Sequence, residues 1–438
     1  MPKKEKSLGV AACTAIVVGN MVGSGFYLSP AAVAPYGNLA IIAWIVMGAG
    51  AICLGLTFAK LARLAPVTGG PYAYTRLAYG DLAGFLIAWG YWISIWTSLP
   101  VIAIAFAGAV MDLFPGLHNR MMAVVLTLTA VWGVVLVNIR GVKAAGLFAE
   151  ITTYSKLVPF AGIALLGLFY VDVANFTPFN SEQTSLVTAA AALAPVTMFA
   201  FLGLESATVP AGDVRNAAIT IPRSTVLGIS IAALLYVLGT VAVMGVVPTK
   251  QLVSSVAPFS DAARIMWGSW GATIVSVAVI VSSVGALNGW TLLMGQVPMA
   301  AARDKLFPPV FAKLSSREVP AIGIVISALL ATVLVLVQAI GAPGFSAFYN
   351  TVVGLSTMAA VIPYAFCALA TGLVASRVSG SGITPRITVT ELIAFMFALF
   401  TLYGCGAQPV LYGLILLLLG IPVFVWQRRR TNLADRGL

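Results

Sequence analysis

Charged residues are scarce in this chain. Asp, Glu, Lys and Arg make up 8% of its 438 residues, whereas hydrophobic residues make up 60% and the mean hydropathy is +1.02. A soluble domain carries roughly 25% charged residues. This deficit excludes an ordinary soluble enzyme or binding domain and predicts an all-α integral membrane protein. We therefore expect one membrane domain over residues 1–438 rather than a set of soluble domains.

Residue types that bind metals or catalyse reactions are also rare. The chain has one histidine, His118, and its four cysteines show no metal-ligand spacing. The cysteines all lie in apolar stretches and are interpreted as packing residues: Cys13, Cys53, Cys367 and Cys405. No acids are paired within these stretches. We therefore expect neither an enzyme nor a metal or other cofactor.

Long apolar runs, in contrast, are abundant. A helix needs about 20 apolar residues to cross a bilayer core. This criterion predicts twelve membrane-spanning helices, near 8–34, 38–63, 84–111, 121–139, 146–170, 185–211, 224–248, 271–300, 320–340, 346–375, 388–404 and 408–426. Because many spans follow the first one, we do not expect the first to be a cleaved signal peptide.

The basic residues are distributed unevenly between the predicted turns. Of the 24 Lys and Arg, 20 lie at the N-terminus, in even-numbered turns or in the C-terminal tail, and three (Arg120, Lys250 and Arg264) lie in odd-numbered turns. By the positive-inside rule, both termini are predicted to be cytoplasmic, in the inner membrane of the cell. This topology accounts for the net charge of +11 without a nucleic-acid partner.

Glycines interrupt two of the predicted spans near their middles. VVGNMVGSGFYLSP carries Gly23, Ser24 and Gly25 in the first span, and TMFAFLGLESATVPAG carries Gly203 and Glu205 in the sixth. Backbone groups freed by such a break are tolerated in a membrane only where they line a polar cavity. Matching breaks in two halves of a membrane protein indicate the substrate site of a secondary transporter.

Two ionisable residues lie inside the predicted spans. Lys156 lies several residues inside the fifth span and Glu205 lies beside the second break. An ionisable group at such depth costs at least about 2.5 kcal/mol and usually faces a polar interior. An alternative remains open for each residue. Lys156 extends its side chain towards the cytoplasmic headgroups, and Glu205 is a structural carboxyl that is hydrogen-bonded to the broken backbone.

Several motifs occur in the order found in one known superfamily: GNMVGSGFYLSP, PVTGGPYAYTRLAYG, FLGLESATVPAGDVRN with IPRS, APFSDAAR, and NGWTLLMGQ with KLFPPVFAKLSSREVP. Together they resemble the amino acid–polyamine–organocation superfamily, its basic amino acid/polyamine antiporter branch, and the arginine/agmatine antiporters most of all. The resemblance implies a LeuT-like fold with broken helices 1 and 6. Its inverted repeats would be 1–170 and 185–375, followed by two additional helices (388–426) and a cytoplasmic tail (427–438). It also implies a homodimer.

The resemblance further implies a set of substrate-binding residues: Asn20, Met21, Val22, Gly23, Ser24, Gly25, Ser94, Ile95, Phe199, Ala200, Leu202, Trp290 and Ser356. Amides after the first break would hold a carboxylate, and carbonyls before the second would accept from an amine. Trp290 would pack against the substrate side chain. Tyr91 and Tyr364 would hydrogen-bond Glu205 as an inner gate. Ordinary helix packing is the alternative for each aromatic residue.

Three positions depart from the arginine/agmatine pattern. Leu99 replaces an asparagine, Phe199 a tryptophan that covers the substrate from outside, and Ala200 a serine. These changes favour a neutral or less polar substrate than arginine, because a cationic side chain loses polar partners and cation–π surface. Lys156 is similar to a lysine that replaces sodium in other superfamily members. This similarity implies sodium independence, with proton coupling if the lysine titrates and exchange if it does not.

The sequence thus predicts an amino-acid transporter of the arginine/agmatine type that exchanges an amino acid for an amine or another amino acid by alternating access. A proton-coupled permease for neutral amino acids is the alternative. A membrane receptor that binds an amino acid without moving it is the alternative from another class, although such receptors usually add a soluble domain. The expected partners are an amino acid or amine, the lipid bilayer, protons and a second copy of the chain.

Overall fold

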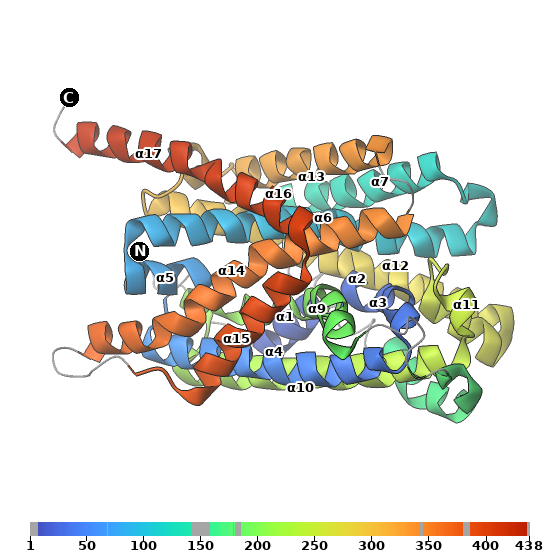
Figure 1. The fold of residues 1–438 in the computed structure, drawn as a ribbon. Coiled ribbons are helices and arrows are strands. Elements are labelled where there is room, and N and C mark those ends of the chain that lie inside the picture. The colour runs from blue at the N-terminus through green and yellow to red at the C-terminus, as the bar shows by residue number, and fades with distance from the viewer. Residues whose placement is uncertain are drawn as a thin grey trace.

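The computed structural model describes residues 8–67, 69–141, 158–177, 179, 185–341, 345–379 and 386–435 (Figure 1). Within these ranges, eight helical stretches are long and apolar enough to cross a membrane: α4 (Leu39–Leu64), α6 (Asp81–Leu113), α7 (Arg120–Ile139), α9 (Leu186–Phe201) with the residues that follow it, α10 (Ala217–Val246), α12 (Pro258–Arg303), α14 (Phe345–Ser379) and the pair α16 (Ala407–Leu418) and α17 (Gly420–Asp435). Shorter apolar helices are α1 (Val10–Met21), Val158–Tyr170, α13 (Ala321–Gly341) and α15 (Val389–Gly404).

The remaining elements are short. They are α2 (Ser24–Tyr27), α3 (Ser29–Val33), α5 (Pro71–Tyr79), α11 (Thr249–Leu252) and the 3₁₀ turns η1 (Ala34–Tyr36), η2 (Pro115–Leu117), η3 (Gly167–Tyr170), η4 (Val173–Phe176), η5 (Ser206–Thr208), η6 (Ala211–Asp213) and η7 (Pro309–Ala312). Within the described ranges no strand forms. Each of the twelve predicted spans overlaps one of the apolar helices, which confirms an all-helical, multi-pass membrane protein. A count of twelve crossings and the inverted repeat stay predictions.

Both predicted interruptions are present in the structure. Helix α1 ends at Met21 and α2 begins at Ser24, with Val22 in an extended conformation between them. Helix α9 ends at Phe201, and the chain then passes through Gly203 at a φ of 97°. Glycine adopts this left-handed conformation without the steric cost that a Cβ imposes. The glycines therefore determine where these helices break.

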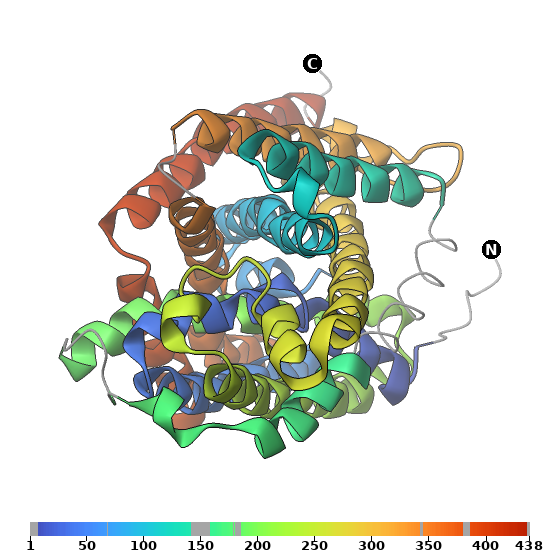
Figure 2. The same ribbon diagram turned by 90° about the vertical axis from the view of Figure 1, so that its right-hand side faces the viewer.

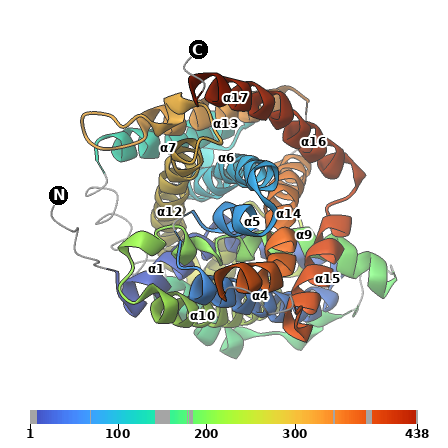
Figure 3. The same ribbon diagram turned by 90° about the vertical axis from the view of Figure 1, so that its left-hand side faces the viewer.

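The long helices form two groups with the broken segments between them. Figure 3 shows the molecule end-on, with α6, α12 and α14 on one side and α4 and α10 on the other, and α1 and α9 between them. Figure 2 shows the same arrangement from the opposite end. The contacts between helices agree with this arrangement. Helix α6 packs against α12 and α14, and α10 packs against α4 and α1. The breaks therefore lie inside the bundle.

The eighth predicted span, 271–300, corresponds to the second of two helical pieces in α12. This helix begins at Pro258 and passes through a bend at Gly268, whose φ is 76°. Arg264, which was assigned to a turn, lies in the helical part before the bend and pairs with Asp112 of α6. The piece before the bend carries Ser260, Asp261 and Arg264, so a criterion based on apolar runs detects only the second piece.

Candidate functional site

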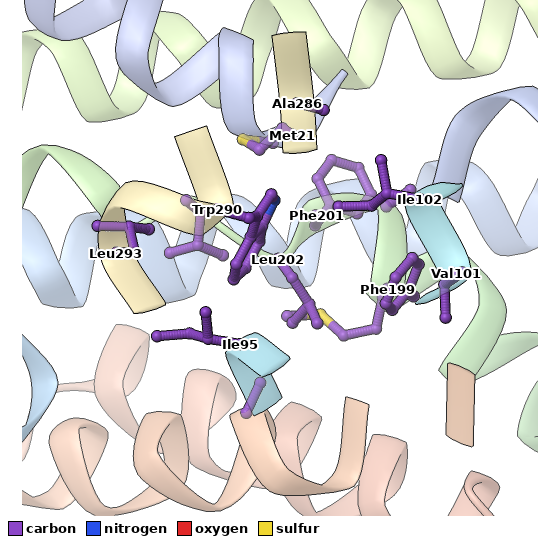
Figure 4. Packing of buried hydrophobic residues seen from close by; sticks show 14 of the residues in the cluster. Met21, Ile95, Val101, Ile102, Phe199, Phe201, Leu202, Ala286, Trp290 and Leu293 are labelled. Atoms are coloured by element: carbon purple, nitrogen blue, oxygen red, sulfur yellow. The ribbon is translucent and has the colours of Figure 1, made fainter. Parts of the chain in front are cut away.

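A small cavity lies between the two broken helices. Its volume is about 10 Å³, and it is lined by Asn20, Met21, Gly23, Gly25, Ile102, Phe199, Leu202, Ala286 and Trp290. Seven of these are among the predicted substrate-binding residues, whereas Ile102 and Ala286 are not. Trp290 lies beside Leu202, and Met21 lies beside Ala286 (Figure 4). Because one water needs about 10–15 Å³, the cavity in this structure is too small for an amino acid.

Glycine allows the two breaks to approach each other closely. A Cβ on Gly25 would lie 2.9 Å from Cα of Ala200 and 2.9 Å from Cδ1 of Phe199. A Cβ on Gly203 would lie 3.0 Å from Cβ of Asn20. The first break therefore packs against α9, and the second break against α1. These glycines both end the helices and make room for the facing backbone.

This packing predicts the effect of one added methyl group. Gly25→Ala would push α2 away from Ala200, and we expect it to lower transport by about tenfold or more, because small displacements at a site are costly. Gly133→Ala is the matched control: nothing lies within 4 Å of a Cβ at that position in α7, so transport should stay normal. Initial rates in proteoliposomes, with thermal unfolding as a folding check, measure both. Equal rates for the two variants would contradict the packing argument.

The first break leaves backbone amides at the start of α2. Ser24 and Gly25 begin this helix, and the first amides of a helix have no partner within the helix itself. The Gly23 carbonyl is engaged, since it accepts from Phe26 at 3.0 Å. On the other side of the break, the Trp290 indole nitrogen donates to the Asn20 carbonyl at 3.3 Å. The indole thereby links α12 to the end of α1.

The carbonyls at the second break are already partly engaged. The Phe199 carbonyl accepts from the Leu202 amide at 3.2 Å, and the Ala200 carbonyl accepts from the Tyr236 hydroxyl at 2.8 Å. Tyr236 lies on α10 and was not predicted, because only packing brings it to α9. A carbonyl oxygen has two lone pairs, so each can accept one further hydrogen bond.

Of the predicted substrate residues whose side chains the structure describes, five do not line the cavity: Val22, Ser94, Ile95, Ala200 and Ser356. The Ser94 carbonyl instead accepts from the hydroxyls of Thr97, Ser98 and Ser356, at 3.2, 2.7 and 3.0 Å. The Ser98 and Ser356 hydroxyl oxygens lie 2.5 Å apart. This buried cluster joins α6 to α14 and leaves the Ser94 carbonyl little capacity for a substrate donor.

Glu205 lies just after the second break and is held by two tyrosines. The Tyr91 hydroxyl donates to Oε1 of Glu205, and the Tyr364 hydroxyl donates to Oε2 at 2.5 Å. All three side chains are fully buried. The tyrosines belong to α6 and α14, so the carboxyl joins both helices to the broken segment. This is the contact pattern that the resemblance implies, and its role in gating stays a proposal.

Two further expectations concern charge and metal at the site. Lys156 lies outside the described residues. Among the residues that the structure describes, no three His, Cys, Asp or Glu side chains come together as metal ligands. Among the side chains that the structure describes, those lining the cavity include no ionisable group, and their polar groups are the Asn20 amide and the Trp290 indole N–H.

These features define a multi-pass membrane protein with a small cavity between two broken helices. Residues 8–419 match the family model "Amino acid permease", and the chain belongs to this family. The putrescine transporter PotE of Haemophilus influenzae is 28% identical over 426 residues, which cover 96% of this chain and 97% of the relative. The cadaverine/lysine antiporter of Escherichia coli K12 is 31% identical over 366 residues, 82% of each chain. The predicted membership in the amino acid–polyamine–organocation superfamily is confirmed, and the chain is a transporter of its amino acid or amine type rather than an enzyme.

Proposed function

We propose that this protein exchanges an amino acid against a related amine or second amino acid by alternating access. The observation that carries the proposal is the cavity between the breaks at Gly23–Gly25 and Gly203. The cavity in this structure is too small for an amino acid, so a substrate enters it only after the walls separate. Relatives named for putrescine transport and for cadaverine/lysine antiport support both the substrate class and the exchange.

We place the substrate backbone against the peptide groups at the two breaks. The amides of Ser24 and Gly25 would bind its carboxylate, since the start of a helix carries a partial positive charge. The carbonyls of Phe199 and Ala200 would accept from its amino group through their second lone pairs. Trp290 would then pack against the side chain of the substrate. The broken helices thereby recognise a zwitterion without a charged residue.

The cavity lining also supports a second candidate, a proton-coupled permease for neutral amino acids. Ile102, Phe199 and Leu202 are apolar, and no acid lines the cavity within the described part of the chain. A second ammonium group, as in lysine or a diamine, would need an acceptor. The acid that follows most closely along the chain is Glu205, three residues after Leu202, and both of its oxygens are occupied by tyrosines.

The proposal also includes the ion coupling of transport and the orientation of the chain in the membrane. Sodium independence depends on Lys156 acting as a fixed positive charge. Cytoplasmic termini in the inner membrane depend on the distribution of Lys and Arg. Helix α5, which carries Arg76, and α17, which carries Arg428, Arg429 and Arg430, lie at the same end of the bundle (Figure 1). We propose that this is the cytoplasmic end, and that the chain forms a homodimer.

Uptake into proteoliposomes tests the function directly. A thermal-shift screen against all amino acids, agmatine, putrescine and cadaverine would first identify a ligand. We expect uptake of the labelled ligand to require an unlabelled substrate inside the vesicles and to be unchanged when sodium is replaced. Uptake that needs a pH gradient but no internal substrate would favour the permease. Sodium-dependent uptake would contradict the proposed sodium independence, and binding without any uptake would favour a receptor.

A further inference from the structure

Helix α5 lies across one end of the bundle, among α4, α6, α12 and α14 (Figure 3). It is only nine residues long, and six of them are buried: Pro71, Tyr72, Ala73, Tyr74, Thr75 and Ala78. It packs against α6 and α14. Its sequence belongs to the motif PVTGGPYAYTRLAYG, to which the substrate site gives no role. A short buried helix in this position lies across any path between the cavity and the water at this end of the bundle.

Helix α5 covers the residues directly beyond Glu205. The Gly69 amide, which precedes α5, donates to the Val209 carbonyl at 3.3 Å, and the Thr208 hydroxyl donates to the Glu205 carbonyl at 2.6 Å. On α14, the Cys367 thiol lies 3.5 Å from the Pro71 carbonyl, one turn beyond Tyr364. Helix α5 therefore contacts both the segment after the second break and α14, whose Tyr364 binds the Glu205 carboxyl.

Both ends of α5 are glycine joints. Gly70, before the helix, has a φ of 63°, and Gly80, after it, has a φ of 92°. Other residues adopt these values only with strain. Glycine has the widest choice of backbone conformations, so rotation of α5 about these two points requires little rearrangement of α4 or α6.

A polar contact fastens α5 to the end of α12. Arg76 lies 2.9 Å from Asp304, and the Tyr72 hydroxyl donates to the same carboxylate at 3.2 Å. Burial, followed by the charge of Asp304, raises the pKa of Tyr72, so the phenol remains a donor. Arg76 also pairs with Asp81 at 2.9 Å, but Asp81 begins α6, the next element of the chain. The contact with Asp304 therefore joins separate elements, whereas the contact with Asp81 stays local.

We propose that α5 is the inner lid of this carrier, that Arg76 and Tyr72 hold it shut against Asp304, and that it swings away when substrate leaves towards this end. The inference rests on the proposed transport function. The side chains of Arg76 and Asp304 are 33% and 41% exposed, and such ion pairs are weak. A weak contact suits a lid, because it must break in each transport cycle.

Cys367 provides a native reporter of lid opening. Its thiol is fully buried beneath the start of α5. In a background with alanine at Cys13, Cys53 and Cys405, Cys367 is the sole thiol of the chain. Lid opening should expose it to a water-soluble maleimide. The parent protein should therefore react slowly, at a rate limited by opening.

The experiment compares labelling rates of purified protein in detergent. We expect Asp304→Asn to accelerate labelling of Cys367 about two- to fivefold, the factor that a weak surface pair provides. Tyr72→Phe, which removes only a hydroxyl, should also accelerate labelling. Asp304→Glu keeps the carboxylate, so it should label as slowly as the parent. Asp81→Asn is the matched control and should leave the rate at the parent value. Thermal unfolding checks that every variant is folded.

The outcomes separate this inference from the transport function. If Asp304→Asn and Asp81→Asn label at the same rate, Asp304 does not hold the lid and the inference is wrong. If the parent labels as fast as unfolded protein, α5 does not cover Cys367. Labelling needs no substrate. If Asp304→Asn accelerates labelling in a protein that shows no uptake, the lid inference is supported and only the proposed transport function is contradicted.

Discussion

Replacing Trp290 with alanine is expected to slow substrate exchange in proteoliposomes by about 100-fold while the protein remains folded. The indole is 3% exposed, lines the cavity and donates to the Asn20 carbonyl at 3.3 Å. Its loss removes both the surface for the substrate side chain and a link between α12 and the first break. Displacement of a bound substrate by about 1 Å can cost 100-fold in rate.

Trp270 supplies the matched control for Trp290. It lies on the same helix, just after the bend at Gly268, and is 64% exposed. Trp270→Ala removes the same side chain from a surface position, so exchange should remain within about twofold of the parent rate. Trp290→Phe should retain part of the activity because it keeps an aromatic face. Near-normal exchange by Trp290→Ala would remove this residue from the substrate site.

Glu205→Gln is expected to lower exchange by about tenfold and to flatten its pH dependence. The amide keeps the shape of the carboxyl but cannot release a proton, and its nitrogen cannot accept from a tyrosine hydroxyl. One tyrosine must therefore reorient. Losing a hydrogen bond to a charged group costs about 1.5–3 kcal/mol, which corresponds to tenfold or more. Initial rates of exchange between pH 5 and pH 8 measure both effects.

Two further variants separate the proton from the hydrogen bonds. Tyr364→Phe removes one donor and keeps the carboxyl, so it should slow exchange but preserve the pH dependence. Glu391→Gln changes another buried acid, which pairs with Lys60 at 2.5 Å, far along the chain from the breaks. It should lower stability without altering the pH profile. An unchanged rate and profile for Glu205→Gln would assign Glu205 a structural role.

The sequence predicted the parts of the site that depend on local backbone chemistry. Gly23, Gly25 and Gly203 mark the breaks because glycine tolerates backbone conformations outside a helix, such as the φ of 97° at Gly203, and the apolar runs mark the helices because backbone groups in lipid must be paired. The resemblance supplied Tyr91 and Tyr364 as partners of Glu205, and the structure brings all three together.

Other features depend on packing that no local pattern reveals. Tyr236 reaches the Ala200 carbonyl only because α10 packs beside α9, and Ala286 lines the cavity only because α12 faces the first break. An alanine or isoleucine in an apolar helix looks the same whether it faces lipid or a cavity. Helix α5 was missed for the opposite reason: it is too short and too polar for a hydropathy criterion, yet it is largely buried.

A structure determined with an exchanged amino acid bound tests the central claim most directly. The proposal predicts that the cavity between the breaks has expanded, with the carboxylate of the substrate within hydrogen-bonding distance of the amides of Ser24 and Gly25. The substrate side chain should lie against Trp290. A substrate bound elsewhere in the bundle, with these walls still in contact, would contradict the proposal.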